Sequence, residues 1–390
     1  MQSRLSFLTR SGAGGFDFQT GFSNQGLSDM SDIEHRGTSR QDSGGSRRTE
    51  AVRVFIDGQA GTTGLRIREL IASHANLELI EIPDRSRKDP AAKDRFINEA
   101  DIVILCLPDD AAREALTMIR NERVRVLDAS SAHRTASKWV YGLPELCPKQ
   151  RERIRQGSRI SNPGCYPTGF ILMIRPLVDA GFLPAGAALS CHAISGFSGG
   201  GRQLIERYED RSAQALDSSK PSNRLDRLWP VRPYALHLDH KHLPEMALHA
   251  GLEAPPIFSP MVGHFAQGML TMIPLSAGML AGRAKDEGAA RVHACLEARY
   301  RNEPCIRVRP LGGEAYLQDG FLDPRLDGHV DGHADEQGKG GNSIELFVFG
   351  NDTRIMLVAR LDNLGKGAAG AAVQNLNLMI GAGEFEGIDL

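Results

Sequence analysis

The chain has 390 residues, of which 41% are hydrophobic, a length and composition typical of a globular protein with two domains. Its formal net charge of −2 argues against nucleic acid or an anionic membrane surface as a partner, and no apolar run reaches the roughly 18 residues of a membrane span. Its six cysteines are scattered without a CxxC pair, which argues against a disulfide framework and a zinc site and favours a reducing, cytoplasmic location.

Residues 1–50 are rich in Ser, Gly and Arg and lack the apolar core of a secretory signal. Such a segment buries too little apolar surface to offset the entropy of ordering it, so we expect a disordered extension. Two alternatives stay open. The natural start is Met30, or the segment is an organellar transit peptide, since its first stretch is poor in acidic residues and carries Arg4 and Arg10.

The next part of the chain alternates between apolar strands and amphipathic helices. The predicted strands are residues 52–58, 77–83, 101–108 and 124–130. The predicted helices are residues 65–74, 89–100 and 110–120. The strand DIVILCLP is apolar throughout, as in a strand that is buried on both faces. This alternation predicts an α/β fold with a doubly wound parallel sheet.

After Gly164 the pattern changes. Helices are predicted at residues 165–180, 289–301 and 367–381, the last of them rich in Ala. Strands are predicted at residues 188–195, 268–276, 305–311, 343–350 and 354–361. Several strands beside a few helices favour an α+β domain with a mixed or antiparallel sheet.

A polar loop at about residues 318–342 contains the doublet DGHVDGHA, whose carboxylates and imidazoles are potential metal ligands. The segment has few apolar residues to fix a ligand geometry, so we interpret it as a solvated insertion and predict no metal site.

Three glycines follow the first strand as GxxGxxG: Gly58, Gly61 and Gly64. Glycine lets the backbone pass close to a pyrophosphate, and the N-terminus of the next helix supplies free N–H groups. Thr62 and Thr63 add hydroxyl donors. The spacing differs from GxGxxG, so a tight turn without a ligand remains the alternative.

The second strand ends before a charged run that contains Asp84, Ser86 and Arg87. A carboxylate at this place suits the ribose diol of NAD, whereas Arg and Ser suit the 2′-phosphate of NADP. Basic residues dominate the run, so we predict NADP as the cofactor, with Ser86 and Arg87 as its contacts. The alternative is a solvated charged loop.

The stretch SNPGCYPTG places Cys165 after a sharp Pro-Gly turn and at the start of a predicted helix. A thiol at a helix N-terminus lies in a positive field that lowers its pKa, so we predict that Cys165 is a nucleophile. A buried cysteine that serves only as a small apolar residue is the alternative. We assign Asn162, in the same turn, to the substrate site.

The segment HKHLPE offers a proton acceptor for this thiol. His240 and His242 are both candidates, and Glu245 follows His242 by three residues, where it would fix the tautomer of the imidazole. A thiolate–imidazolium pair would activate the sulfur of Cys165, and the imidazole would later protonate a developing alkoxide. A surface histidine cluster is the alternative reading.

A second glycine-rich loop, SGFSGGGR, spans residues 195–202. It does not follow the first strand, so we do not interpret it as a nucleotide site. Its backbone N–H groups and Arg202 are suited to a phosphate or a carboxylate, and we predict substrate contacts from Ser198, Gly199 and Arg202.

These motifs closely resemble those of the N-acetyl-gamma-glutamyl-phosphate reductase family, part of the semialdehyde dehydrogenase superfamily. The strongest is SNPGCYPTG, and GQAGTTGLRI, YGLPEL, GFSGGGR, HKHLPEM and LDNLGKGAAGAAVQNLNLM are similar to other family segments. They resemble the shorter bacterial subtype in particular. The likeness runs from about residue 52 to the end, while residues 1–50 and the DGHVDGHA doublet depart from it.

The resemblance implies a Rossmann-type NADP domain at residues 51–164, completed by a C-terminal helix at 363–382. It also implies a catalytic and oligomerisation domain at 165–362, in a dimer or tetramer. Cys165 is then the nucleophile and His242 the acid/base with Glu245 behind it. Asn363 is then a contact on the nicotinamide side.

The implied reaction is reduction of N-acetyl-L-glutamyl 5-phosphate by NADPH, through a thioester on Cys165, to the 5-semialdehyde and phosphate in arginine biosynthesis. An aspartate-semialdehyde or aminoadipate-type reductase is the alternative within the same chemistry. A non-catalytic nucleotide-binding regulator is the alternative of a different class.

Overall fold

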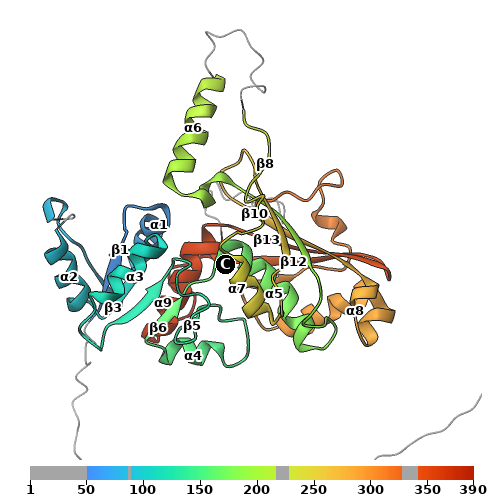
Figure 1. The fold of residues 1–390 in the computed structure, drawn as a ribbon, viewed down its shortest axis with the longest axis horizontal. Helices are drawn as coiled ribbons and strands as arrows, with labels where there is room; N and C mark the ends of the chain where they lie inside the picture. Colours follow the sequence, from blue (N-terminus) through green and yellow to red (C-terminus); the bar gives the residue numbers. More distant parts are fainter. Residues whose placement is uncertain (1–50, 87–88, 217–227, 327–340) are drawn as a thin grey trace, which may run out of the picture. The chain divides into compact units, whose positions relative to one another are not determined.

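The computed structural model describes residues 51–86, 89–216, 228–326 and 341–390 (Figure 1). Three features named above lie outside these residues: the extension at 1–50, Arg87, and the DGHVDGHA doublet. The expectations attached to them therefore stay predictions.

The first half of the chain forms a six-stranded sheet whose neighbours all pair in parallel, in the order β2-β1-β3-β4-β6-β5. Its strands are β1 Val52–Asp57, β2 Leu77–Ile80, β3 Ile102–Leu105, β4 Arg125–Asp128, β5 Val140–Tyr141 and β6 Arg159–Ser161. Every residue of β3 is buried, because helices cover both faces of the sheet. The predicted doubly wound parallel sheet is confirmed.

Two apolar clusters fill the two faces of this sheet. The helices in this half are α1 Thr62–Ile71, α2 Pro90–Glu99, α3 Asp109–Thr117 and α4 Gln150–Gln156. Ile97 of α2 and Ala112 of α3 pack on one face, whereas Ile67 of α1 packs on the other. The second face is completed by the C-terminal helix α9, Gly370–Ile380, through Val373 and Leu376. The end of the chain thus returns to the sheet with which the described part begins.

The second half forms a seven-stranded sheet in the order β11-β12-β13-β10-β7-β9-β8. Its strands are β7 Ser190–Ser195, β8 Arg232–Pro233, β9 Ile257–Val262, β10 Met269–Ser276, β11 Ile306–Val308, β12 Ile344–Gly350 and β13 Arg354–Leu361. The pairs β7–β9 and β11–β12 are parallel and the other neighbours are antiparallel, so the predicted mixed sheet is confirmed.

The helices of this half are α5 Cys165–Asp179, α6 Arg202–Leu216, α7 Leu243–Ala250 and α8 Arg283–Tyr300. An apolar core joins α5 and α8 to one face of the second sheet, and α5 is buried along most of its length. By contrast, α6 projects away from both sheets in Figure 1. None of the described helices is long and apolar enough to cross a membrane.

Several elements were not predicted from the sequence, among them α4, α6, α7, β5, β6, β8 and β9. Most are short, and α6 follows directly on a run of glycines that we interpreted only as a loop. There the chain makes a short helical turn at Phe197–Gly200 and changes direction at Gly201, whose φ of 76° favours glycine. The division of the chain into domains at residue 164 stays a prediction.

Candidate active site

Cys165 is the first residue of α5 and lies at the carboxyl edge of the first sheet. Strand β6 ends at Ser161, and Asn162, Pro163 and Gly164 turn the chain into the helix. Gly164 is the N-cap residue, and no side chain caps the helix. Because α5 begins at Cys165, the predicted position of the thiol at a helix N-terminus is confirmed. The carboxyl edge is also where ligands bind in open parallel sheets.

Gly164 lets two cationic or basic side chains approach the turn before Cys165. A Cβ atom at Gly164 would lie 2.5 Å from Arg134 Nη1 and 2.8 Å from His242 Nε2, far inside normal contact distance. From the other side, a Cβ atom at Gly367 would lie 2.9 Å from Cys165 Cβ. The two glycines therefore allow Arg134, His242 and the segment after β13 to close around the cysteine.

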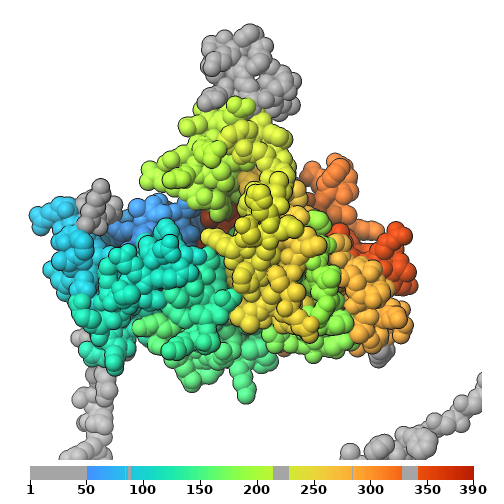
Figure 2. Space-filling view, in the orientation of Figure 1, coloured from blue at the N-terminus to red at the C-terminus, as the bar shows by residue number. Residues whose placement is uncertain are grey.

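One cavity of about 380 Å³ connects the glycine-rich turn of α1 with Cys165. Most of the residues that we predicted from separate motifs line it together, namely Thr62, Thr63, Asn162, Cys165, Ser198, Gly199, His240, His242 and Asn363. It continues toward a groove between α1 and α6. In Figure 2 the C-terminal segment is visible at the bottom of a hollow between the blue α1 and the yellow-green α6. The structure thus brings the two predicted glycine-rich loops to one site.

The three glycines of the turn before α1 are explained by different physical reasons. A Cβ atom at Gly58 would lie 2.2 Å from Cys106 O, and one at Gly64 would lie 2.5 Å from Gly58 O, so packing alone demands both glycines. At Gly61 the nearest atom would be 3.4 Å away, which is ordinary contact. Gly61 is also the N-cap of α1, where no side chain caps the helix. This open helix N-terminus fits the pyrophosphate of a dinucleotide.

The charged run after β2 is only partly described. Ser86 ends a short helical turn, Asp84–Ser86, and is partly buried. Its predicted partner Arg87 lies outside the described residues. Selection of the 2′-phosphate by this run stays a prediction.

The thiol of Cys165 is protonated at rest. Burial raises the pKa of Cys165 to about 11, although the charge of Arg134 and the backbone N–H groups at the start of α5 act to lower it. The helix N-terminus thus acts in the expected direction, but the predicted net lowering of the pKa of this thiol is wrong. Loss of solvent around the sulfur outweighs the positive field.

The imidazole of His242 is neutral at rest. Burial and the nearby charge of Arg134 hold the pKa of His242 well below its usual 6.5, and burial lowers the pKa of His240 to about 4. His242 Nδ1 is buried and has no hydrogen-bond partner among the described residues. A thiolate–imidazolium pair is thus not the resting state, and the two groups face the same cavity as a neutral thiol and a neutral base.

Contrary to our expectation, Glu245 does not orient the His242 imidazole by a hydrogen bond. Its Oε1 accepts hydrogen bonds from the Tyr141 hydroxyl at 2.7 Å and from Gly164 N at 2.8 Å, and its Oε2 accepts one from Arg134 Nη1 at 3.0 Å. The carboxylate therefore fixes the turn before Cys165 rather than the imidazole. The three-residue spacing was misleading because His242 precedes α7 and Glu245 lies in its first turn, facing the protein interior.

Arg134 is a site residue that the sequence analysis missed. Besides Glu245, its guanidinium donates to Asn162 O at 2.9 Å and to Ala129 O at 3.1 Å, and it lines the cavity that contains Cys165. The available signal was its place in the loop that follows β4, at the same carboxyl edge as Cys165. Arg134 carries a buried positive charge next to the thiol.

Three side chains that we predicted to contact the substrate or the cofactor form hydrogen bonds within the protein. Asn162 Nδ2 donates to Ala368 O at 2.9 Å, and its Oδ1 accepts from Asn375 Nδ2 at 3.0 Å. Asn363 Nδ2 donates to Ser198 Oγ at 2.9 Å. These bonds connect the turn before Cys165 with the C-terminal segment, and that segment with the second glycine-rich loop. They favour a role for the side chains in holding the cavity wall.

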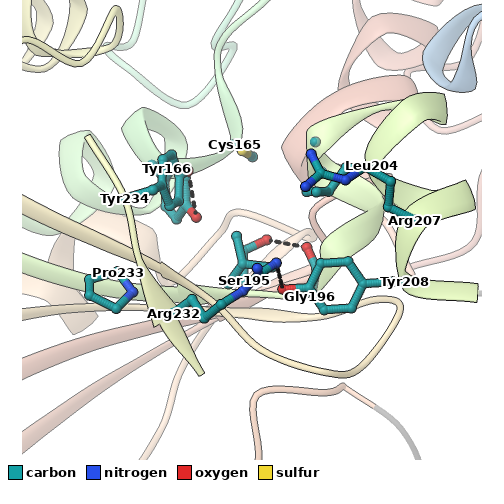
Figure 3. A pocket seen from close by; sticks show the side chains of 13 residues that line it. Cys165, Tyr166, Ser195, Gly196, Leu204, Arg207, Tyr208, Arg232, Pro233 and Tyr234 are labelled. Atoms are coloured by element: carbon teal, nitrogen blue, oxygen red, sulfur yellow. Dashed lines mark hydrogen bonds between the residues drawn. The ribbon is translucent and has the colours of Figure 1, made fainter. Parts of the chain in front are cut away.

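Arg202 does not line the cavities at Cys165 in the described residues, contrary to our prediction. It is largely exposed, pairs with Glu206 one turn along α6 at 2.8 Å, and lines the groove beside α1. A second cavity at Cys165, of about 420 Å³, is lined instead by Arg207 and Arg232 (Figure 3). Arg202 opens the helix, so its side chain points to the other side from Arg207.

Known proteins match the chain over nearly all of its described length. The family models "Semialdehyde dehydrogenase, NAD binding domain" and "Semialdehyde dehydrogenase, dimerisation domain" match residues 53–155 and 165–363. An N-acetyl-gamma-glutamyl-phosphate reductase 2 of Pseudomonas putida is 47% identical over 339 residues, which are 86% of this chain and 98% of that protein. A protein of the same name from Nostoc sp. is 44% identical, covering 86% of this chain and 99% of its own. The chain belongs to the N-acetyl-gamma-glutamyl-phosphate reductase family.

The resemblance drawn from the sequence is thus confirmed at the level of the family, and a reductase of this family is an oxidoreductase. A Brucella ovis N-acetyl-gamma-glutamyl-phosphate reductase is 45% identical and covers 84% of this chain and 99% of its own. The subtype stays a prediction.

Solved aspartate semialdehyde dehydrogenases share the fold of this N-acetyl-gamma-glutamyl-phosphate reductase family member. Enzyme II of Vibrio cholerae matches with a TM-score of 0.60 at 17% identity over 85% of this chain and 99% of its own. The Francisella tularensis protein matches with a TM-score of 0.62 at 12% identity over 84% of this chain and 100% of its own. At this identity the likeness concerns the fold alone.

Proposed function

We propose that the chain uses NADPH to reduce N-acetyl-L-glutamyl 5-phosphate to N-acetyl-L-glutamate 5-semialdehyde and phosphate, a step of arginine biosynthesis, through a thioester on Cys165. The observation that carries the proposal is the shared cavity: Cys165, His242 and the turn at Thr62 and Thr63 meet there, in a chain whose relatives bear this enzyme's name. A nucleophile, a base and a dinucleotide turn on one cavity are what this reaction requires.

In the first step the sulfur of Cys165 attacks the acyl carbon while His242 takes the thiol proton. Because both groups are neutral before the reaction, we propose that the proton moves from sulfur to His242 during the attack rather than before it. The bond from carbon to the phosphate oxygen breaks, phosphate leaves and takes a proton from solvent, and a thioester remains. The positive charge of Arg134 stabilises the sulfur as it loses its proton.

In the second step the thioester carbonyl carbon is reduced, and NADPH, when bound at the start of α1, would supply the hydride. The protonated His242 gives its proton to the oxygen, which forms a thiohemiacetal on Cys165. When the carbon–sulfur bond breaks, the hydroxyl proton returns to the sulfur through His242 and the aldehyde is released. One proton is consumed overall, and the thiol is regenerated.

For the cofactor we propose that Gly61, Thr62 and Thr63 hold the pyrophosphate at the start of α1. The uncapped helix N-terminus and the absence of a packing reason for Gly61 support this role. We further propose Ser86 and Arg87 for the 2′-phosphate and place Asn363 toward the nicotinamide, on the wall that Cys165 shares.

The oligomer that we propose is a homodimer formed through the face of the second sheet opposite α5 and α8, in a cytoplasmic enzyme. This face carries partly buried apolar side chains on neighbouring strands, among them Ile194, Met272, Phe349 and Met356. The family model that matches the same half is described as a dimerisation domain. Light scattering of the purified chain after size exclusion tests this proposal, and a monomer at micromolar concentration would contradict it.

The experiment for the reaction itself uses Cys165→Ser in the reverse direction, with the semialdehyde, phosphate and NADP as substrates. We expect loss of nearly all phosphate-dependent formation of NADPH, while binding of NADPH measured by fluorescence stays within threefold of wild type. Substantial turnover by the variant would contradict the nucleophile.

The rival functions give different results in the same assay. Aspartate or aminoadipate semialdehyde as the preferred substrate would favour the related reductases. Binding of NADPH without turnover of any semialdehyde by the wild type would favour a regulator.

A further inference from the structure

A cluster of arginines forms one wall of the second cavity at Cys165. Arg207 on α6 and Arg232 on β8 line this cavity together with Cys165, Tyr166 and Tyr234 (Figure 3). The cavity lacks His242 and the turn of α1, both of which belong to the first cavity. Cys165 thus lies between a dinucleotide side and an arginine side.

Trp229 holds the arginines in place. The guanidinium carbon of Arg232 lies 3.8 Å from the centre of the Trp229 ring, and those of Arg207 and Arg211 lie 5.7 Å and 6.0 Å from it. Arg232 Nη2 also donates to the Tyr208 hydroxyl at 3.0 Å. Cation–π contacts at these distances orient the guanidinium groups before any ligand arrives.

The positive charge of this wall is not neutralised within the described residues. No ion pair there joins Arg207, Arg211 or Arg232 to a carboxylate, whereas Arg202 on the same helix pairs with Glu206. Arg232 Nε is buried and has no hydrogen-bond partner among the described residues. Like charges held around one ring repel one another, and a buried donor without a partner among the described residues costs free energy, so the wall is suited to binding an anion.

We propose that Arg207 and Arg232, held on the Trp229 ring, bind the carboxylate of the acyl-amino-acid substrate and select for it. The proposal rests on the proposed function, whose substrate carries a carboxylate at the end opposite the reacting acyl phosphate. The planar forks of two arginines match a carboxylate. Leu204, Pro233 and Val262 add an apolar surface for the rest of the chain, in a cavity whose size is typical of small-molecule sites.

The reverse reaction separates the two anions that the wall could recognise, because the semialdehyde carries the carboxylate and phosphate is a separate substrate. For Arg232→Gln and Arg207→Gln we expect KM for the semialdehyde to rise about 10- to 100-fold, with KM for phosphate changed less than threefold. A rise in KM for phosphate alone would overturn the proposal and assign the wall to the phosphate.

A second measurement replaces the carboxylate of the semialdehyde by a carboxamide. Wild type should prefer the carboxylate by about 10- to 100-fold in kcat/KM, and Arg232→Gln should lose most of that preference. Equal discrimination by the two proteins would contradict the proposal. Arg211→Gln is the matched control, since Arg211 lies on the same helix near the same ring but does not line the cavity.

Two controls keep these outcomes distinct from other failures. Arg207 is exposed, so Arg207→Gln should fold even if Arg232→Gln does not, and NADPH binding checks both. If wild type does not turn over the semialdehyde, the proposed function is contradicted. If wild type is active and the arginine variants have its KM for the semialdehyde, only the role of the arginines is contradicted.

Discussion

The buried ion pair between Glu145 and Lys366 should contribute strongly to stability. Neither side chain is exposed, and Lys366 Nζ lies 2.8 Å from Glu145 Oε1. The same oxygen accepts from Gln374 Nε2 at 2.8 Å and from Cys305 Sγ at 2.9 Å. Lys366 belongs to a π-helical turn, Gly365–Ala369, whose Gly367 packs on Cys165. The pair therefore connects the stability of the fold to the position of the nucleophile.

Replacing Lys366 by Met leaves the charge of Glu145 buried without its cation. Breaking a buried pair from one side typically costs about 3–5 kcal/mol, so we expect the free energy of unfolding to fall by that amount. In the double variant Glu145→Leu/Lys366→Met no charge remains buried. The free energy of unfolding of the double variant should fall by much less than the sum of the two single decreases. We expect a decrease of about 1 kcal/mol for each neutral hydrogen bond removed.

The pH dependence of stability gives an independent signature. Burial would raise the pKa of Glu145, but the charge of Lys366 and the hydrogen bonds from Cys305 and Gln374 depress it from 4.5 to about 2. A depression of this size contributes about 3 kcal/mol, present above pH 4.5 and lost as the pH falls toward 2. In Lys366→Met the depression is gone, so the gap between wild type and variant should narrow from pH 7 to pH 3.

Urea denaturation followed by circular dichroism, at one protein concentration, measures these differences. Glu145→Leu serves as the matched single variant on the other side of the pair. Additive losses in the double variant, or a gap that does not change with pH, would refute the reasoning, because either result means that the two side chains do not stabilise each other.

Two further predictions concern the cysteine. With the pKa of Cys165 near 11, inactivation by iodoacetamide should speed up about tenfold for each pH unit from 7 to 10, and a plateau above pH 7 would reveal a thiolate at neutral pH instead. Gly164→Ala should lower kcat by about 100-fold, because the new methyl group displaces Arg134 or His242 from the turn. A crystal structure or NADPH titration of that variant controls for misfolding, and wild-type kcat would show that neither side chain needs its observed place.

The sequence by itself determined the local elements and the place of the nucleophile. Hydrophobic periodicity over about ten residues suffices to predict β1 through α3, and the Pro-Gly turn before an apolar run suffices to start α5 at Cys165. The glycine-rich turn of α1 was also readable, since Gly58 and Gly64 are demanded by contacts within the strand–turn–helix unit and its neighbouring strand. Apart from the contact of Gly58 with Cys106, these features depend on interactions that are close along the chain or repeated within one element.

Only the tertiary structure decided which side chains meet at the cysteine. The bond from Arg134 to Glu245 joins residues 111 apart in the sequence, and no local pattern marks either as the other's partner. The same holds for the arginines that line the second cavity at Cys165. The sequence pointed to Arg202, but Arg207 and Arg232 line the cavity because of how α6 and β8 pack around Trp229. The pKa of Cys165 was misjudged for a related reason. A helix N-terminus is visible in the sequence, but the loss of solvent around a sulfur atom depends on every element that packs over it.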